Sequence, residues 1–256
     1  MDPWHWVDTH GHVFLVDDDP EAVLDRAAAA GVAWVMCPGI DVATSRRSEE
    51  LANAHADSML WSAGLHPHDA GQWSTVRDQI GELAERADAI GECGLDYYRD
   101  LATREDQAAA FGDQLALAVE LDKPIIIHCR DAFADVYDAL AAADIGERAV
   151  LHCWTGGSRW TKRFRDLGVV FSFAGTLTYP TAESLRIAAR FAPRDRTMVE
   201  TDAPYLTPQP RRSEPNEPAH VVMTGATLAE VWEMPVADVA DLTSATARRV
   251  FGGPHA

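Results

Sequence analysis

Eight short runs of apolar and often β-branched residues recur along this chain, separated by segments with helical periodicity. The runs lie at roughly Trp6–Thr9, Ala33–Cys37, Leu60–Leu65, Asp88–Glu92, Pro124–His128, Ala149–His152, Val169–Phe173 and Met198–Thr201. The intervals are long enough for a loop and a helix, which predicts parallel strands joined by helical crossovers. Eight such units in 256 residues favour one α/β domain over residues 1–256, a (β/α)8 TIM barrel. An open doubly wound sheet is the alternative.

Five of these runs end in, or are directly followed by, imidazole or carboxylate side chains that could bind a metal ion. These are His10 and His12 at the first run, then Glu92, His128, His152 and Asp202. All strands of a barrel end on one face, so side chains distant in sequence converge there, whereas an open sheet gives no reason for convergence. Residues i and i+2 of a strand share a face, so His10 and His12 can bind one ion. The pattern indicates a divalent-metal hydrolase with its site at the C-terminal face.

The donor set predicts two divalent ions. The expected ligands are His10, His12 and Asp202 for one ion, and His128 and His152 for the second. Glu92, on the strand between these groups, could bridge both ions through its two oxygens. Two ions roughly 4 Å apart can orient water and stabilise charge on a phosphoryl or acyl oxygen. Asp202 is the candidate base for that water. We therefore expect catalytic roles for Asp202 as the base and for Glu92 as the bridge. The mixed donors fit Mg²⁺, Mn²⁺ or Zn²⁺.

The formal net charge of −18 argues against a protein that coats nucleic acid, because such proteins present a large basic face. It leaves room for an enzyme that binds one phosphate through metal ions and a few arginines. No apolar run approaches the length of a membrane span, and the start, Met1-Asp2-Pro3-Trp4, lacks the features of a signal peptide. We therefore expect no membrane association, and nothing in the sequence points to an obligate protein partner.

The four cysteines, Cys37, Cys93, Cys129 and Cys153, show no CxxC spacing. Three of them directly follow a proposed ligand, so in a continuing strand they would face away from the barrel axis. We expect reduced, buried thiols packed between strands and helices, and hence a cytoplasmic protein. A thiolate metal site or a redox pair is the alternative.

Local signals place several helices and one irregular segment. Thr103-x-x-Asp106 has the form of a capping box and predicts a helix start. Four prolines within residues 207–218 forbid regular structure for most of that stretch. Because it follows the eighth strand, it should lie across the mouth of the barrel, where loops contact substrate. We expect two last helices, at about 219–231 and 236–250, to complete the outer ring.

Several ordered motifs together resemble the TatD family of metal-dependent DNases in the amidohydrolase superfamily. The matching segments are Asp8-Thr9-His10-Gly11-His12, Gly64-Leu65-His66-Pro67-His68, Ile90-Gly91-Glu92-Cys93-Gly94-Leu95-Asp96-Tyr97-Tyr98, Pro124-Ile125-Ile126-Ile127-His128-Cys129-Arg130-Asp131-Ala132, His152-Cys153-Trp154-Thr155-Gly156 and Glu200-Thr201-Asp202-Ala203-Pro204-Tyr205-Leu206. Their order and spacing match from near Asp8 to about residue 218. An HxH alone is weak evidence, whereas the ordered set is specific.

The resemblance implies a TIM barrel, one or two divalent cations and 3′–5′ exonuclease activity on single-stranded or damaged nucleic acid. It implies metal roles for the same six residues that the strand ends indicate. The chain departs from the family pattern at a few positions. Gly11, Phe14 and Trp154 replace residues common in the family, and Pro215 stands where the family has an arginine before Asn216-Glu217-Pro218.

His66, His68 and Arg130 are the candidates for substrate binding, because imidazolium and guanidinium groups donate hydrogen bonds to phosphate oxygens. A capping or loop role for His68 and an ion pair for Arg130 are the structural alternatives. Three aromatic residues that follow ligand strands, Tyr97, Tyr98 and Trp154, could stack on bases. Packing beneath the mouth loops is equally compatible with their positions.

Together with this resemblance, the sequence favours a hydrolase that removes nucleotides from the ends of DNA or RNA. The resemblance implies a 3′–5′ exodeoxyribonuclease. One alternative keeps the metals but cleaves a C–N or C–O bond, as an amidohydrolase or lactonase does. A carbamylated lysine often bridges the ions in such enzymes, whereas the fourth run ends in Glu92, and Lys123 lies before the fifth run. A non-catalytic, metal-stabilised scaffold is a second alternative.

Overall fold

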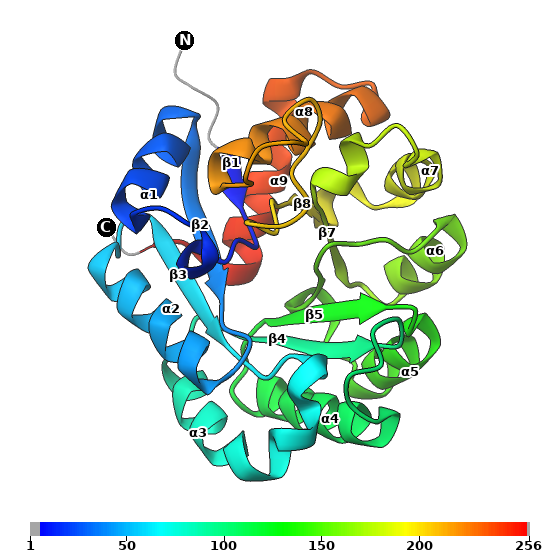
Figure 1. The fold of residues 1–256 in the computed structure, drawn as a ribbon. Coiled ribbons are helices and arrows are strands. Elements are labelled where there is room, and N and C mark those ends of the chain that lie inside the picture. The colour runs from blue at the N-terminus through cyan, green and yellow to red at the C-terminus, as the bar shows by residue number, and fades with distance from the viewer. Residues whose placement is uncertain (1–5, 255–256) are drawn as a thin grey trace.

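A computed structural model describes residues 6–254, and its strands form one eight-stranded sheet in chain order (Figure 1). The strands are β1 (Trp6–Asp8), β2 (Val32–Pro38), β3 (Met59–Ala63), β4 (Ala89–Asp96), β5 (Ile125–Arg130), β6 (Ala149–Leu151), β7 (Val170–Phe173) and β8 (Thr197–Val199). Every neighbouring pair from β1 to β8 is parallel. This is the arrangement that the alternating runs predict.

The sheet closes where the ends of β1 and β8 meet. The amide of Thr9 donates to the carbonyl of Val199 at 3.2 Å, and the amide of Asp202 donates to the carbonyl of His10 at 2.8 Å. Gly11 and Ala203 form a parallel bridge just beyond. The (β/α)8 barrel is therefore confirmed, and the open doubly wound sheet is wrong.

Helices surround the barrel, as Figure 1 shows from α1 round to α8. They are α1 (Pro20–Ala29), α2 (Val42–Ala54), α3 (Trp73–Arg86), α4 (Arg104–Glu120), α5 (Phe133–Ala143), α6 (Ser158–Asp166), α7 (Glu183–Phe191), α8 (Val221–Trp232) and α9 (Val236–Phe251). Short 3₁₀ helices are η1 (Val13–Leu15), η2 (Pro67–Gln72), η3 (Gly146–Arg148), η4 (Gly175–Thr178), η5 (Arg194–Arg196) and η6 (Pro218–His220). Thr103 caps α4 by accepting a hydrogen bond from the amide of Asp106, as the sequence predicts.

The last helix differs from its expected place. Ala247 and Phe251 of α9 belong to the cluster formed by buried residues from all eight strands, such as Val7, Ile126 and Val170. The expectation that α9 helps to complete the outer ring therefore gives only part of its place, because its C-terminal half also packs on this inner cluster. Val239 and Ala240, nearer the start of α9, belong instead to the large cluster that contains Leu228 and Val231 of α8.

Strand ends also differ from the sequence expectation, and the difference affects the site. β1, β6 and β8 stop before His10, His152 and Asp202, so these residues lie just past their strands. β4 instead continues four residues beyond Glu92 to Asp96, with a register shift between Ile90 and Cys93. Glu92 therefore lies within its strand and not at its end.

The proline-rich segment at 207–218 is anchored to the end of β8. Asn216 is fully buried, and its side-chain amide donates to the carbonyl of Thr201 at 2.9 Å. Glu217 pairs with Arg26 of α1 at 2.7 Å. Arg26 thus supplies a cation beside the Asn-Glu-Pro segment, while Pro215 stands at the position where the resemblance led us to look for one.

Cys37, Cys93 and Cys129 are buried free thiols, as expected, whereas Cys153 is only partly buried. Within residues 6–254, none of the helices combines the length and the apolar character that a bilayer crossing needs. The cytoplasmic location inferred from the cysteines stays a prediction.

Two helical glycines test the packing of α8 on β1. A Cβ at Gly225 would come 2.2 Å from the ring of Trp6, while a Cβ at Gly112 of α4 would meet nothing within 4 Å. We expect Gly225→Ala to lower the free energy of unfolding by about 1–3 kcal/mol through overpacking. Gly112→Ala should raise it by about 0.5–1 kcal/mol, because alanine is the better helix former. Urea unfolding of both variants measures this, and equal effects would contradict the packing described.

Candidate metal centre

Glu92 lies at the centre of the mouth, between two groups of imidazoles. Its Oε2 atom is 3.3 Å from His10 Nε2 and 3.6 Å from His12 Nε2. Its Oε1 atom is 3.0 Å from His152 Nε2, 3.1 Å from His128 Nδ1 and 3.3 Å from His66 Nε2. One carboxylate oxygen therefore faces the histidines after β1, and the other faces one histidine within β5 and two that follow β3 and β6.

His10, His12 and Asp202 form the first group. The Nε2 atoms of His10 and His12 are 3.3 Å apart, and Asp202 Oδ1 lies 3.8 Å and 3.7 Å from them. The two histidines converge although β1 has ended, because Gly11 between them still pairs with Ala203 as in a parallel strand. A Cβ at Gly11 would face Asp8 and Thr201, away from the imidazoles, as the sequence predicts.

The second group is larger than expected. His128 Nδ1 and His152 Nε2 lie 3.4 Å apart. His66, which the sequence suggested as a phosphate contact, also belongs here, because one nitrogen of His66, one of His128 and one oxygen of Glu92 all lie within 4.8 Å of one another. The loop after β3 returns toward the barrel axis and carries His66 into the centre.

The other two candidates for substrate binding lie further out. His68 Nε2 is 3.0 Å from Asp96 Oδ2, which is also 3.0 Å from His128 Nε2. Arg130 is exposed at the end of β5, and its guanidinium lies over the ring of Tyr98 at 3.9 Å. The structure therefore joins His68 to the second group through a carboxylate and leaves Arg130 open to solvent.

Three carboxylates at the centre were missed by reasoning from the sequence. Asp96 was missed because the fourth strand was expected to end at Glu92. In the structure β4 runs on to Asp96, four residues after Glu92. Glu200 accepts a hydrogen bond from the amide of Cys153 at 2.7 Å and lies 3.3 Å from His152 Nδ1. The signal for Glu200 was its place two residues before Asp202.

Asp8 is the third missed carboxylate, and it joins β1 to the segment after β8. Its oxygens accept hydrogen bonds from the amide of Thr201 at 2.8 Å and from the Thr201 hydroxyl at 2.5 Å. Burial raises the pKa of Asp8 to about 8, although the hydrogen bonds from Thr201 oppose that rise. Asp8 thus positions the backbone that carries His10 and Asp202.

The charges at the centre depend strongly on one another. Burial alone would raise the pKa of Glu92, but the imidazoles of His152 and His66 outweigh it and hold that pKa well below its usual value. Burial and the neighbouring His10 lower the pKa of His12 to about 3. Burial, with Glu92 nearby, raises the pKa of Asp202 well above its ordinary value.

The donors fit a divalent cation. The facing Nε2 atoms of His10 and His12 both point toward carboxylate oxygens, and Nδ1 of His10 is buried without a hydrogen-bond partner. In three groups, one ligand atom from each residue lies within 4.8 Å of the others: His10, His12 and Asp202; His10, His152 and Glu200; His66, Glu92 and His128. Imidazole and carboxylate donors at such spacing are typical of Zn²⁺, Mn²⁺ or hydrated Mg²⁺ sites.

Exposure separates the aromatic side chains near the mouth. Trp154 is buried in the core, and Tyr97 is half-buried with its hydroxyl bonded to Asp135. Tyr98 is 61% exposed, and Tyr205, beside His12, is 54% exposed. Of the three aromatics suggested by the sequence, only Tyr98 is open to solvent, and Tyr205 was missed.

Comparisons with known proteins agree with this geometry. The family model of TatD related DNase matches residues 7–252. The chain is 36% identical to the uncharacterized metal-dependent hydrolase YabD of Bacillus subtilis (strain 168), covering 95% of this chain and 98% of that protein. It is also 36% identical to the 3′-5′ ssDNA/RNA exonuclease TatD of Pectobacterium parmentieri (strain WPP163), covering 92% and 94%.

A solved structure has the same fold. The crystal structure of YJJV, a TatD homolog from Escherichia coli K12, superposes with a TM-score of 0.88 at 29% identity, covering 97% of this chain and 98% of that one. The chain therefore belongs to the family of TatD-related DNases and is a metal-dependent hydrolase.

Proposed function

We propose that this protein is a phosphodiesterase that removes nucleotides from the 3′ ends of single-stranded or damaged DNA, and of RNA, with two divalent cations. The observation that carries the proposal is the place of Glu92, whose two oxygens face two separate groups of imidazoles. Mg²⁺, Mn²⁺ and Zn²⁺ all suit the donors. The relative from Pectobacterium parmentieri, which is named as such an exonuclease, supports the choice of substrate.

The residues would divide the work by position. His10, His12 and Asp202 would hold one cation, and His128, His152 and His66 the second, with Glu92 between them. When bound, the cations supply Lewis acidity toward a phosphoryl oxygen. Asp202 is partly open to the mouth, with 15% of its side chain exposed, so it can accept a proton from an attacking water.

Substrate would be held locally and not over a large surface. Arg130 offers exposed N–H donors to a phosphate oxygen, and the ring of Tyr98 holds its guanidinium in place. His68, whose Nε2 lies 3.0 Å from Asp96 beside the second group, would be a second contact for the nucleic-acid strand. The net charge of −18 keeps other contacts with nucleic acid weak.

The amidohydrolase alternative requires a different bridge. Lys123 donates its ammonium hydrogens to the carbonyls of Ala84, Glu85 and Ala87 at 2.6–2.8 Å. It is therefore engaged at the end of α3, before β4 begins, and does not compete with Glu92. We treat cleavage of small amides or lactones as an outcome of the test below.

We expect metal-stripped protein to be inactive and Mg²⁺, Mn²⁺ or Zn²⁺ to restore hydrolysis of bis(p-nitrophenyl) phosphate and of 5′-labelled single-stranded DNA. Glu92→Gln should lower turnover at least about a hundredfold, since loss of one charge affects both cation groups. The exposed Glu105→Gln on α4 is the matched control and should behave as wild type.

The readout is a ladder of products that shortens from the 3′ end. Wild-type turnover by Glu92→Gln at saturating metal contradicts the role of Glu92. If metal binds but phosphodiesters stay intact, lactones and amides are tested next, and bound metal without any turnover would support a scaffold.

A separate expectation concerns Glu200, which contacts the outward nitrogen of His152. Glu200→Gln should weaken binding of the second cation about 10–100-fold, as loss of a partner behind a metal-bound histidine does. Titration of Mn²⁺ into the apo protein, followed by the paramagnetic signal of free ion, measures this. Unchanged affinity would show that Glu200 does not orient His152.

A further inference from the structure

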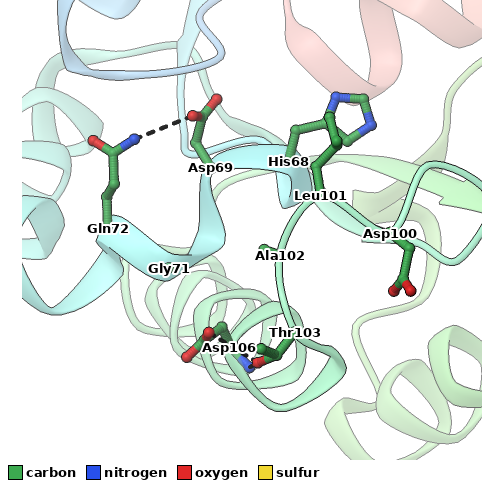
Figure 2. Close-up of a pocket in the computed structure, with 9 residues that line it drawn as sticks. All are labelled: His68, Asp69, Gly71, Gln72, Asp100, Leu101, Ala102, Thr103 and Asp106. Atoms are coloured by element: carbon green, nitrogen blue, oxygen red, sulfur yellow. Dashed lines mark hydrogen bonds between the residues drawn. The ribbon is translucent and has the colours of Figure 1, made fainter.

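A cavity of about 540 Å³ opens beside the metal centre, between η2 and the loop that follows β4 (Figure 2). Its lining residues are His68, Asp69, Gly71, Gln72, Asp100, Leu101, Ala102, Thr103 and Asp106. This volume lies within the range of about 300–1,000 Å³ that is usual for small-molecule sites. None of the residues assigned above to cation binding lines it, so it is a distinct space.

One layer of imidazoles separates the cavity from the centre. His68 forms part of the cavity wall, and its ring lies 4.2 Å from the ring of His66. His66 Nε2 in turn lies 3.3 Å from Glu92 Oε1. The cavity therefore adjoins the centre, with only His68 and His66 between its wall and Glu92 along this line of contacts.

The lining determines which chemistry fits. It contains the carboxylates of Asp69, Asp100 and Asp106 and neither lysine nor arginine. A phosphate is repelled by such a wall, whereas carboxylates accept hydrogen bonds from amino and imino groups. Leu101, 65% exposed at the rim, offers an apolar surface for the face of a ring.

Two of the carboxylates retain free acceptor capacity. Asp69 accepts from the side-chain amide of Gln72 through Oδ1, a bond drawn in Figure 2, which leaves its Oδ2 available. Asp106 accepts from the Thr103 hydroxyl through Oδ2, which leaves its Oδ1. The pocket is therefore an array of acceptors beside an apolar edge.

We propose that this cavity receives the base of the terminal nucleotide and selects bases by the hydrogen-bond donors on their edges. The inference rests on the proposed phosphodiesterase function. Guanine presents an imino and an amino donor side by side, so it can use two of the free acceptor oxygens of the lining at once. Adenine and cytosine present one amino group. Thymine and uracil present a single imino group between two carbonyl oxygens, and these oxygens are repelled by a wall of carboxylates. The expected order is guanine first, adenine and cytosine next, and thymine last.

Gly71 permits a direct test. A Cβ at Gly71 would meet only an Asp106 oxygen at 3.9 Å, and its φ is not positive, so a side chain there enters the cavity without strain. Gly71→Leu should fill the space. Gly81→Leu on α3 is the matched control, because a Cβ at Gly81 meets nothing within 4 Å and the residue does not line the cavity.

The first measurement is binding of free nucleosides to the apo protein by calorimetry, which needs neither a phosphate nor a metal. We expect deoxyguanosine to bind roughly tenfold more tightly than thymidine, as expected for one base contact of this kind. Gly71→Leu should abolish this difference, and Gly81→Leu should retain it. Equal binding of all nucleosides, or binding unchanged in Gly71→Leu, overturns the proposal. So does a site that takes Mg²⁺ alone and no nucleoside.

The second measurement compares hydrolysis of oligonucleotides ending in dG or dT with that of bis(p-nitrophenyl) phosphate, which has no base. We expect Gly71→Leu to lose the preference for dG while it keeps wild-type turnover of bis(p-nitrophenyl) phosphate. If the wild-type protein hydrolyses no phosphodiester at all, the proposed function is refuted. The nucleoside titration still tests the cavity in that case.

Discussion

A single buried carboxylate in contact with five imidazoles is the interaction on which the site depends. Glu92 is 3% exposed and lies within 3.6 Å of His10, His12, His66, His128 and His152. A buried charge is costly unless it is paired, and these imidazoles, or the cations they would share with it, supply the pairing. The two oxygens of one side chain thus divide the mouth into two groups of donors.

The barrel makes this contact possible by closing at the right place. Asp8 and Thr201 bind one another across the junction of the first and last strands, and Thr9 and Ser172 share a hydrogen bond of 2.9 Å beneath it. These buried polar pairs fix the backbone that presents His10 and Asp202. The acidic cavity beside His68 uses the same mouth, so the cation groups and the proposed base pocket are built from adjacent loops.

Much of the architecture could be predicted from the sequence, because apolar runs alternate with helical segments throughout and their ends carry metal-binding side chains. The position of His66 in the second group could not, since a loop after β3 brings it inward and no local pattern reports that turn. Asp96 was missed because the fourth strand was expected to end at Glu92, and Glu200 was missed because Asp202, two residues later, was taken as the ligand of its strand. The place of α9 depends on the inner cluster that it covers, which is a tertiary property. Sequence spacing therefore locates a site at the mouth, whereas the return of loops decides which neighbours complete it.

The claim that two cations bind on either side of Glu92 is tested most directly by crystals soaked in Mn²⁺ and measured at the manganese absorption edge. The account predicts two anomalous peaks at the mouth, one beside His10, His12 and Asp202 and the other beside His66, His128 and His152. Both should lie within bonding distance of Glu92. A single peak away from Glu92, or manganese bound only outside the mouth, would contradict it.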